Sequence, residues 1–257
     1  MRGNLRARRI VIIIFWIAVW QIAAMSIDNS IVFVGPADVL RSFSQLVGEP
    51  DFWKSIAGSF GKISAGFLSA FLFGILLGSL SYHNRLLREV LEPVVALMKS
   101  IPVASFVILA LIWIGSKNLS VFISFSVVFP VIYINTISGL LSTDPGLLEM
   151  AEVFSVRLPK RIHYIYVPAL LPYLVNGCKV ALGMSWKSGI AAEVIGVPSN
   201  TIGENLYMAK IYLSTADLFA WTIVIIIVSS VFEKLFLLLI KAGSRQLWRG
   251  GSNHAAI

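Results

Sequence analysis

The chain has 257 residues, of which 57 % are hydrophobic and only 13 % are charged, and its mean hydropathy is +0.84. Soluble globular proteins carry about 25 % charged residues, so this composition excludes a soluble protein, and no polar block is long enough to form a soluble domain beside a single anchor. The net charge of +8 does not indicate a nucleic-acid partner, because the basic residues stand at the ends of apolar runs. The sequence predicts an all-α polytopic protein whose solvent is the lipid bilayer.

The first apolar run extends from Ile10 to about Ile27 and follows four arginines, Arg2, Arg6, Arg8 and Arg9. Such a run fits a signal peptide, with Ala24-Met25-Ser26 as the cleavage site, or an uncleaved transmembrane helix. We favour the uncleaved helix, because the run is long enough to cross a bilayer and carries Trp16 and Trp20.

A short amphipathic helix is expected to begin at Gly35-Pro36 and to end at Val47. The second span then runs from about residue 56 to residue 82. Within it, Gly74 and Gly78 stand four residues apart, a spacing that lets helices approach each other closely in lipid. We therefore expect this span to pack tightly against another helix.

The third span is predicted to be interrupted. The apolar residues from Pro102 to Gly115 number only 14, which corresponds to about 21 Å of helix against about 30 Å of hydrocarbon. A charged loop is expected at 83–92. The helix should therefore begin near Leu91 and be broken or bent at Pro93 and Pro102.

Three more spans are expected at about 119–141, 168–197 and 218–240, which makes six transmembrane helices. With the amino terminus inside, the basic residues outside the spans divide twelve to four in favour of the cytoplasm, as the positive-inside rule requires. The twelve are Arg2, Arg6, Arg8, Arg9, Arg85, Arg88, Arg157, Lys160, Arg161, Lys241, Arg245 and Arg249; the four are Arg41, Lys54, Lys117 and Lys210.

The predicted organisation has three parts. Residues 1–55 form the first helix and an extracytoplasmic amphipathic segment, residues 56–241 form the transmembrane core, and residues 242–257 form a cytoplasmic tail. The core contains one long cytoplasmic loop at 144–166. Both chain termini are expected in the cytoplasm.

That loop begins with a charged, amphipathic helix between two apolar spans. Asp144 is expected to cap the helix, and Pro145 fits its first turn. Its apolar stripe comprises Leu147, Leu148, Ala151 and Phe154, and the carboxylates on another face are those of Glu149 and Glu152. Because so short a helix is marginal in water, we expect a partner to receive the stripe in a groove. The alternative, a helix lying on the membrane surface, fits poorly with acidic residues beside anionic lipid.

Several segments of this sequence resemble the binding-protein-dependent ABC importer permeases, most closely the nitrate/sulfonate/taurine group. Glu149-Met150-Ala151 with Val167-Pro168-Ala169-Leu170-Leu171-Pro172 is similar to the EAA loop of that family. The resemblance extends in order through Pro36-Ala37-Asp38-Val39-Leu40, Ser100-Ile101-Pro102-Val103-Ala104, Phe129-Pro130-Val131-Ile132-Tyr133-Ile134-Asn135-Thr136 and Trp186 with Ala191-Ala192-Glu193. Where the family has a glycine after the loop helix, this chain has Ser155. Serine can make the turn at a cost of about 1 kcal/mol or less if its φ stays negative.

The resemblance implies a type I ABC importer permease fold in the bacterial plasma (inner) membrane. It also implies two cytoplasmic ABC ATPase subunits, a second copy of the permease and an extracytoplasmic solute-binding protein. The residues expected to couple to the ATPase are Glu149, Met150, Ala151, Glu152, Phe154, Ser155 and Pro168. Gly61-Lys62-Ile63-Ser64 does not make a phosphate loop, so ATP and Mg²⁺ are expected in the partner subunits. The chain itself is expected to be no enzyme and to need no cofactor.

Three charges, Lys179, Lys187 and Glu193, lie inside the fifth span, where ionisable groups usually face a cavity or a partner. Lys187 and Glu193 are six residues apart and point away from each other, which disfavours an ion pair within the helix. The charges either hold neighbouring helices in register or line the translocation pathway, with Lys187 facing an anionic solute. The candidate pathway residues are Trp186, Lys187, Glu193 and Pro102.

Other functions are less well supported. An ion-gradient-driven secondary transporter would need converging membrane carboxylates, and only Glu193 is a good candidate. A membrane enzyme is disfavoured because the three histidines are scattered in loops and the tail. The single cysteine, Cys178, excludes an intramolecular disulfide and is expected to be a small core residue. The substrate is not readable, and nitrate, sulfonates, taurine, bicarbonate and vitamin-precursor heterocycles all remain open by resemblance.

Overall fold

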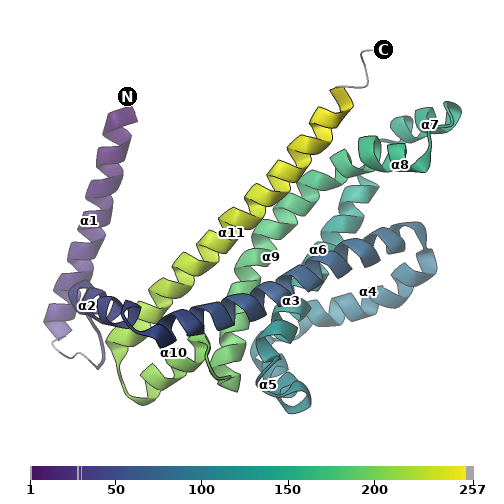
Figure 1. The fold of residues 1–257 in the computed structure, drawn as a ribbon. Helices are drawn as coiled ribbons and strands as arrows, with labels where there is room; N and C mark the ends of the chain where they lie inside the picture. Colours follow the sequence, from purple (N-terminus) through teal and green to yellow (C-terminus); the bar gives the residue numbers. More distant parts are fainter. Residues whose placement is uncertain (1, 28, 30, 253–257) are drawn as a thin grey trace. The chain divides into compact units, whose positions relative to one another are not determined.

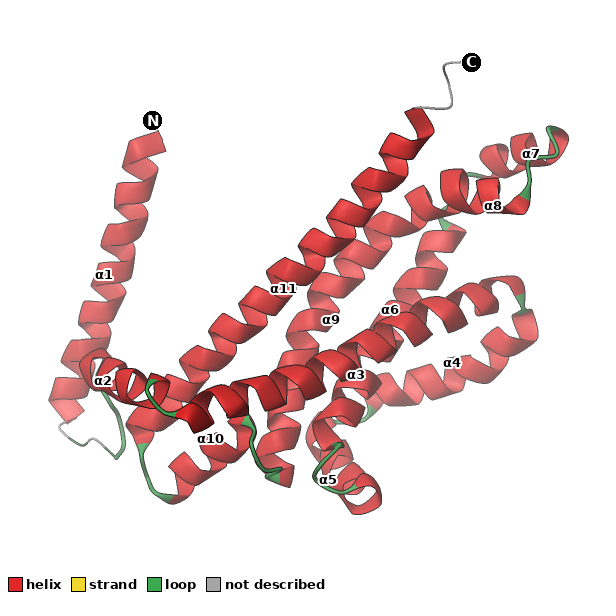
Figure 2. Ribbon diagram, viewed as in Figure 1, coloured by secondary structure: helices red, strands yellow, loops and turns green. Residues whose placement is uncertain are grey.

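A computed structural model describes the backbone of residues 2–27, 29 and 31–252 and the side chains of residues 8, 10–27, 29 and 31–242. The described chain is helical throughout, with short connections (Figures 1 and 2). Its helices are α1 Arg2–Ile27, α2 Pro36–Val47, α3 Pro50–His83, α4 Arg85–Ser100, α5 Val103–Ile114, α6 Leu119–Leu141, α7 Pro145–Val153, α8 Leu158–Arg161, a π-helix Ile162–Tyr166, α9 Val167–Gly196, α10 Ile202–Ile211 and α11 Thr215–Ser252.

Some predicted features lie outside the described side chains. These are the side chains of the predicted cytoplasmic bases Arg2, Arg6, Arg9, Arg245 and Arg249, and those of nearly all of the predicted tail 242–257.

Five helical segments in the described part of the chain are long and apolar enough to cross a bilayer. They cover residues 10–27, 50–83, 119–141, 158–196 and 215–242, and the bent pair α4–α5 adds a sixth if its two members form one span. The membrane-spanning, all-helical fold class is therefore confirmed. The short polar helix α10 is a feature that the hydropathy pattern did not predict; the hydroxyl of Thr201 caps it by accepting from the amide of Glu204 at 3.2 Å.

The third span is broken, as predicted, with a bend of 110° between α4 and α5. The break lies at Pro102, which precedes the first residue of α5. At Pro93, where a break or a bend was expected, the helix does not break, because α4 continues through this residue. The expected charged loop at 83–92 is also wrong: the Asn84 side chain caps α4 by accepting from the amide of Leu87 at 3.2 Å, so the helix starts at once.

The chain packs as two compact units. The small unit comprises residues 1–59 and 197–227, and the large unit comprises residues 60–196 and 228–257. In the small unit a buried cluster joins Val34, Val39 and Ala220. The indole N–H of Trp20 in α1 donates to the carbonyl of Val34 at 3.0 Å, so the first helix is held to the segment before α2.

The large unit is built around α6, most of which is buried. The predicted close approach at Gly74 and Gly78 is confirmed. A Cβ at Gly74 would lie 2.8 Å from Ile132, and a Cβ at Gly78 would lie 2.8 Å from Thr136, so α3 touches α6 with no room for a side chain.

Contacts at the two ends of α6 show in which direction the neighbouring helices run along it. Near the start of α6, Leu119 and Ile123 pack with Val107 of α5 and Ala192 of α9. Near its end, Gly139 lies against Leu170 at the start of α9, which makes α6 and α9 antiparallel. The beginning of α4 lines a cavity with the end of α6, while α5 packs on its start. The pair α4–α5 therefore traverses the length of α6, which favours one broken span over a re-entrant loop.

We expect Gly78→Leu to destabilise the protein by about 1–3 kcal/mol, because overpacking forces α3 away from α6. The matched control is Gly61→Leu on the same helix, since a Cβ at Gly61 would meet no described atom outside its own helix within 4 Å. Thermal unfolding of detergent-purified protein, followed by size-exclusion fluorescence, measures the effect. Equal Tm values for the two variants would contradict the tight α3–α6 contact.

Candidate coupling and translocation sites

The helix expected to meet a partner is α7, which lies with α8 beyond the ends of α6 and α9 in the large unit (Figure 1). The predicted cap is confirmed: the Asp144 carboxylate accepts from the amide of Gly146 at 2.8 Å, and Pro145 occupies the first turn. The helix ends at Val153, so Phe154, the last residue of the predicted stripe, is its C-cap.

A tight turn closes α7. The amide of Val156 donates to the carbonyl of Ala151 at 2.8 Å, and the amide of Ser155 donates to that of Glu152 at 2.9 Å. This pair of bonds is the Schellman motif, which places a left-handed residue just after the helix, usually glycine. Ser155 has φ of +51°, so the condition of negative φ, under which serine would make the turn at low cost, is not met. The same turn is made by a serine held in a conformation that glycine adopts more readily.

Arg161 holds this turn from outside, a role that its sequence position did not reveal. Its Nε donates to the carbonyl of Val156 at 2.7 Å, and its Nη2 donates to that of Ala151 at 3.0 Å. A cation at the carboxyl end of a helix also opposes the helix dipole favourably. The only sequence signal was a basic residue soon after a short helix. Sequence analysis counted Arg161 only as a cytoplasmic base.

The predicted apolar stripe of α7 is divided between two faces. Ala151 is fully buried and Leu148 is half-buried, so these two residues face the loop itself. Four apolar side chains on the other side are 43–79 % exposed; we call them the docking face, and they are Leu147, Met150, Val153 and Phe154. Glu149, Glu152 and Ser155 are exposed beside them, whereas Pro168 is half-buried in the first turn of α9.

The candidate pathway residues do not gather on one surface. Lys187 is exposed on α9, but its neighbour Trp186 is only 2 % exposed and packs between Phe60 and Phe232. Glu193 is fully buried. Pro102 is exposed at the break between α4 and α5. Among the four predicted residues, only Lys187 and Pro102 are accessible.

These features define a class of protein: a multi-pass helical membrane subunit that presents a short, rigid, partly apolar helix between its two most tightly paired spans. Residues 70–247 match the family described as binding-protein-dependent transport system inner membrane component. The chain belongs to this family.

Relatives agree with this assignment, and a solved structure shares the fold. The chain is 26 % identical to a putative aliphatic sulfonate transport permease of Bacillus subtilis (strain 168), over 87 % of this chain and 81 % of the relative. It is 24 % identical to a taurine transport system permease of Escherichia coli (strain K12), over 83 % and 80 %. In fold it is similar to a chain of the MetNI methionine ABC transporter in an inward-facing conformation, with a TM-score of 0.54 and 17 % identity over 75 % of this chain and 99 % of that one.

Membership of the family settles the general role. The protein is the permease component of a binding-protein-dependent ABC importer in the inner membrane, and its partners are an ATPase and a solute-binding protein. In this family the permease is the transmembrane subunit, and ATP is bound by the partner ATPase. The type I importer fold is confirmed, and a transporter driven only by an ion gradient is excluded.

We expect Ser155→Gly to tighten the turn after α7 by about 1 kcal/mol, because a side chain at positive φ is strained and glycine is not. Hydrogen exchange of the Val156 amide, which donates to Ala151, should slow by about fivefold. Ser142→Gly is the control, since Ser142 ends α6 with φ of −79° and should gain nothing. Faster exchange at Val156 in Ser155→Gly would show that the serine side chain stabilises the turn.

Proposed function

We propose that α7 couples the permease to its ATPase by inserting the docking face into a groove of that subunit. The observation that carries this proposal is the exposure of three apolar side chains on a nine-residue helix and of a fourth, Phe154, at its C-cap. Apolar surface of this kind marks a protein or membrane contact, and the exposed carboxylates of Glu149 and Glu152 favour a protein partner over anionic lipid.

Rigidity of the loop supports the same proposal. A lever transmits movement only if it does not bend, and α7 is capped by Asp144 at one end and closed by the Schellman turn at the other. Arg161 adds two hydrogen bonds to the carbonyls of that turn. Movement of the ATPase would therefore reach α6 and α9, the two spans joined by the loop.

We expect Phe154→Asp and Glu149→Lys to abolish solute-stimulated ATP hydrolysis, because one places a charge in the apolar contact and the other reverses a charge beside it. The assay is ATPase activity of the complete transporter in proteoliposomes with its binding protein. Leu86→Asp, which adds a carboxylate at an exposed apolar position on α4, is expected to retain stimulation. Full stimulation in both α7 variants would refute the coupling role. Ala151→Asp abolishes coupling as well, by disrupting the loop, since Ala151 is buried.

We further propose that two identical copies of this permease import a small anionic solute by alternating access, with both chain termini in the cytoplasm. ATP binding would close the ATPase dimer and open the spans outward, and hydrolysis would reset them, since ATP binds the two states with different affinity. Two observations support an anionic solute: Lys187 exposes a cation on a membrane span, and the relatives reported above are permeases for sulfonates and taurine.

We expect Lys187→Met to assemble normally and to import ethanesulfonate at about a tenth of the original rate or less, because the pathway loses its cation. Lys179→Met is the matched control, since Lys179 is exposed on the same helix two turns earlier, and this variant is expected to retain uptake. Uptake of labelled ethanesulfonate into proteoliposomes measures both variants. Normal uptake by Lys187→Met would remove Lys187 from the pathway.

A further inference from the structure

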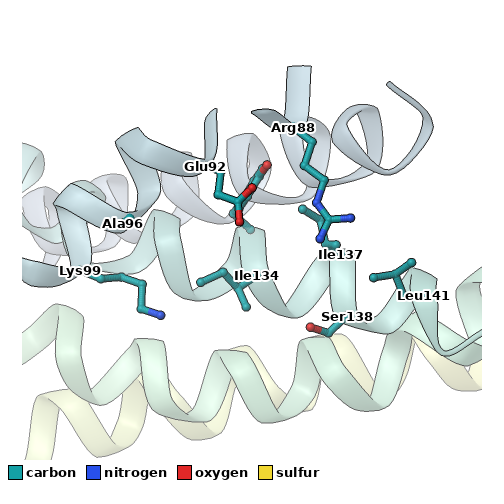
Figure 3. A pocket seen from close by; sticks show the side chains of 9 residues that line it. Arg88, Glu92, Ala96, Lys99, Ile134, Ile137, Ser138 and Leu141 are labelled. Atoms are coloured by element: carbon teal, nitrogen blue, oxygen red, sulfur yellow. The ribbon is translucent and has the colours of Figure 1, made fainter. Parts of the chain in front are cut away.

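A cavity of about 310 Å³ lies between α4 and α6, wholly within the large unit, and sequence analysis did not identify it. Three charged side chains of α4 extend into it toward α6, as Figure 3 shows. They are Arg88, Glu92 and Lys99, which share one face of the helix because they are four and seven residues apart. The α6 side is lined by Tyr133, Ile134, Ile137, Ser138 and Leu141.

The two cations in the cavity have no anionic partner. Within the described residues neither Arg88 nor Lys99 forms an ion pair. Another arginine of the same helix behaves differently: Arg85, outside the cavity, pairs with Glu89 at 2.8 Å. Arg88 stands at the same spacing from Glu92 without a salt bridge between them. The cavity therefore holds two cations that are available to a ligand.

Tyr133 is one of the α6 residues that line the cavity. The Tyr133 side chain is only 3 % exposed, and its hydroxyl has no hydrogen-bond partner among the described atoms. The hydroxyl is therefore closed to a ligand in the cavity, and recognition of an anion there rests on Arg88 and Lys99.

We propose that this cavity is a binding site for a small monovalent oxyanion, such as an alkyl sulfonate, a carboxylate or bicarbonate. Arg88 and Lys99 supply the charge-assisted hydrogen bonds. The carboxylate of Glu92 reduces the charge of the three side chains to +1, since two cations and one carboxylate are present. The site therefore favours a monoanion over a dianion such as sulfate.

The location of the cavity fits a site on the transport route. Lys99 belongs to the broken third span, where charges usually mark a solute or ion pathway, and Arg88 stands at its predicted cytoplasmic end. The cavity borders the half of α6 that leads into α7, so an occupant would contact the span nearest to the coupling helix. This role on the route rests on the proposed function, whereas oxyanion binding itself does not.

Equilibrium binding tests the site without ATP or transport. The permease–ATPase complex is placed in phosphatidylcholine nanodiscs and titrated with labelled ethanesulfonate, with sulfate as the dianionic probe. We expect saturable binding of ethanesulfonate that Arg88→Gln and Lys99→Gln each weaken by about tenfold. Arg85→Gln is the matched control and should bind as the unmodified protein does. Glu92→Gln should improve sulfate binding more than ethanesulfonate binding.

The outcomes separate the site from the proposed function. Absence of saturable ethanesulfonate binding, or equal binding by Arg88→Gln and Arg85→Gln, would overturn the site. Binding without ATP-driven uptake would contradict only the transport role. Repeating the titration in nanodiscs that contain phosphatidylglycerol distinguishes a free oxyanion from a lipid phosphate as the occupant. If phosphatidylglycerol competes with ethanesulfonate in the unmodified protein but not in Arg88→Gln, the site is supported and its occupant is a lipid phosphate.

Discussion

Close contact between helix backbones is the constraint on which the large unit depends. Lipid offers no hydrophobic force to bring apolar helices together, so they associate by tight packing. At Gly74 and Gly78 the α3 helix touches Ile132 and Thr136 of α6 with no space for a Cβ. At its other contacts α6 pairs with α9 along its length. Because α3 and α9 both pack closely against α6, the two helices that the loop joins, α6 and α9, are fixed relative to each other.

The fixed pair α6 and α9 explains why so short a helix as α7 can carry a mechanical role. Nine residues alone would be marginal in water. Here the helix is closed by a left-handed serine and held by Arg161. The loop turns its small residue, Ala151, inward and leaves its larger apolar residues outside. The same packing thus produces both the stiffness of the loop and its exposed docking face.

The charges of the membrane spans show how far residue spacing can be trusted. Spacing along α9 correctly separated Lys187 from Glu193, since one is exposed and the other fully buried. It could not show that Trp186 packs between two phenylalanines. Nor could it show that Arg88 and Lys99, which lie on α4, share a cavity with Tyr133 of α6. Such groupings depend on which faces of different helices meet, and hydropathy contains no information about that.

The sequence by itself determined the membrane class, the interrupted third span, the exact extent of α6 and the cap at Asp144, because each depends on composition or on neighbours along the chain. Only the tertiary structure decided the positive φ of Ser155, the hydrogen bonds of Arg161 to the turn and the division of the α7 stripe into buried and exposed faces. These features arise from contacts between residues brought together by folding, so no local pattern could specify them.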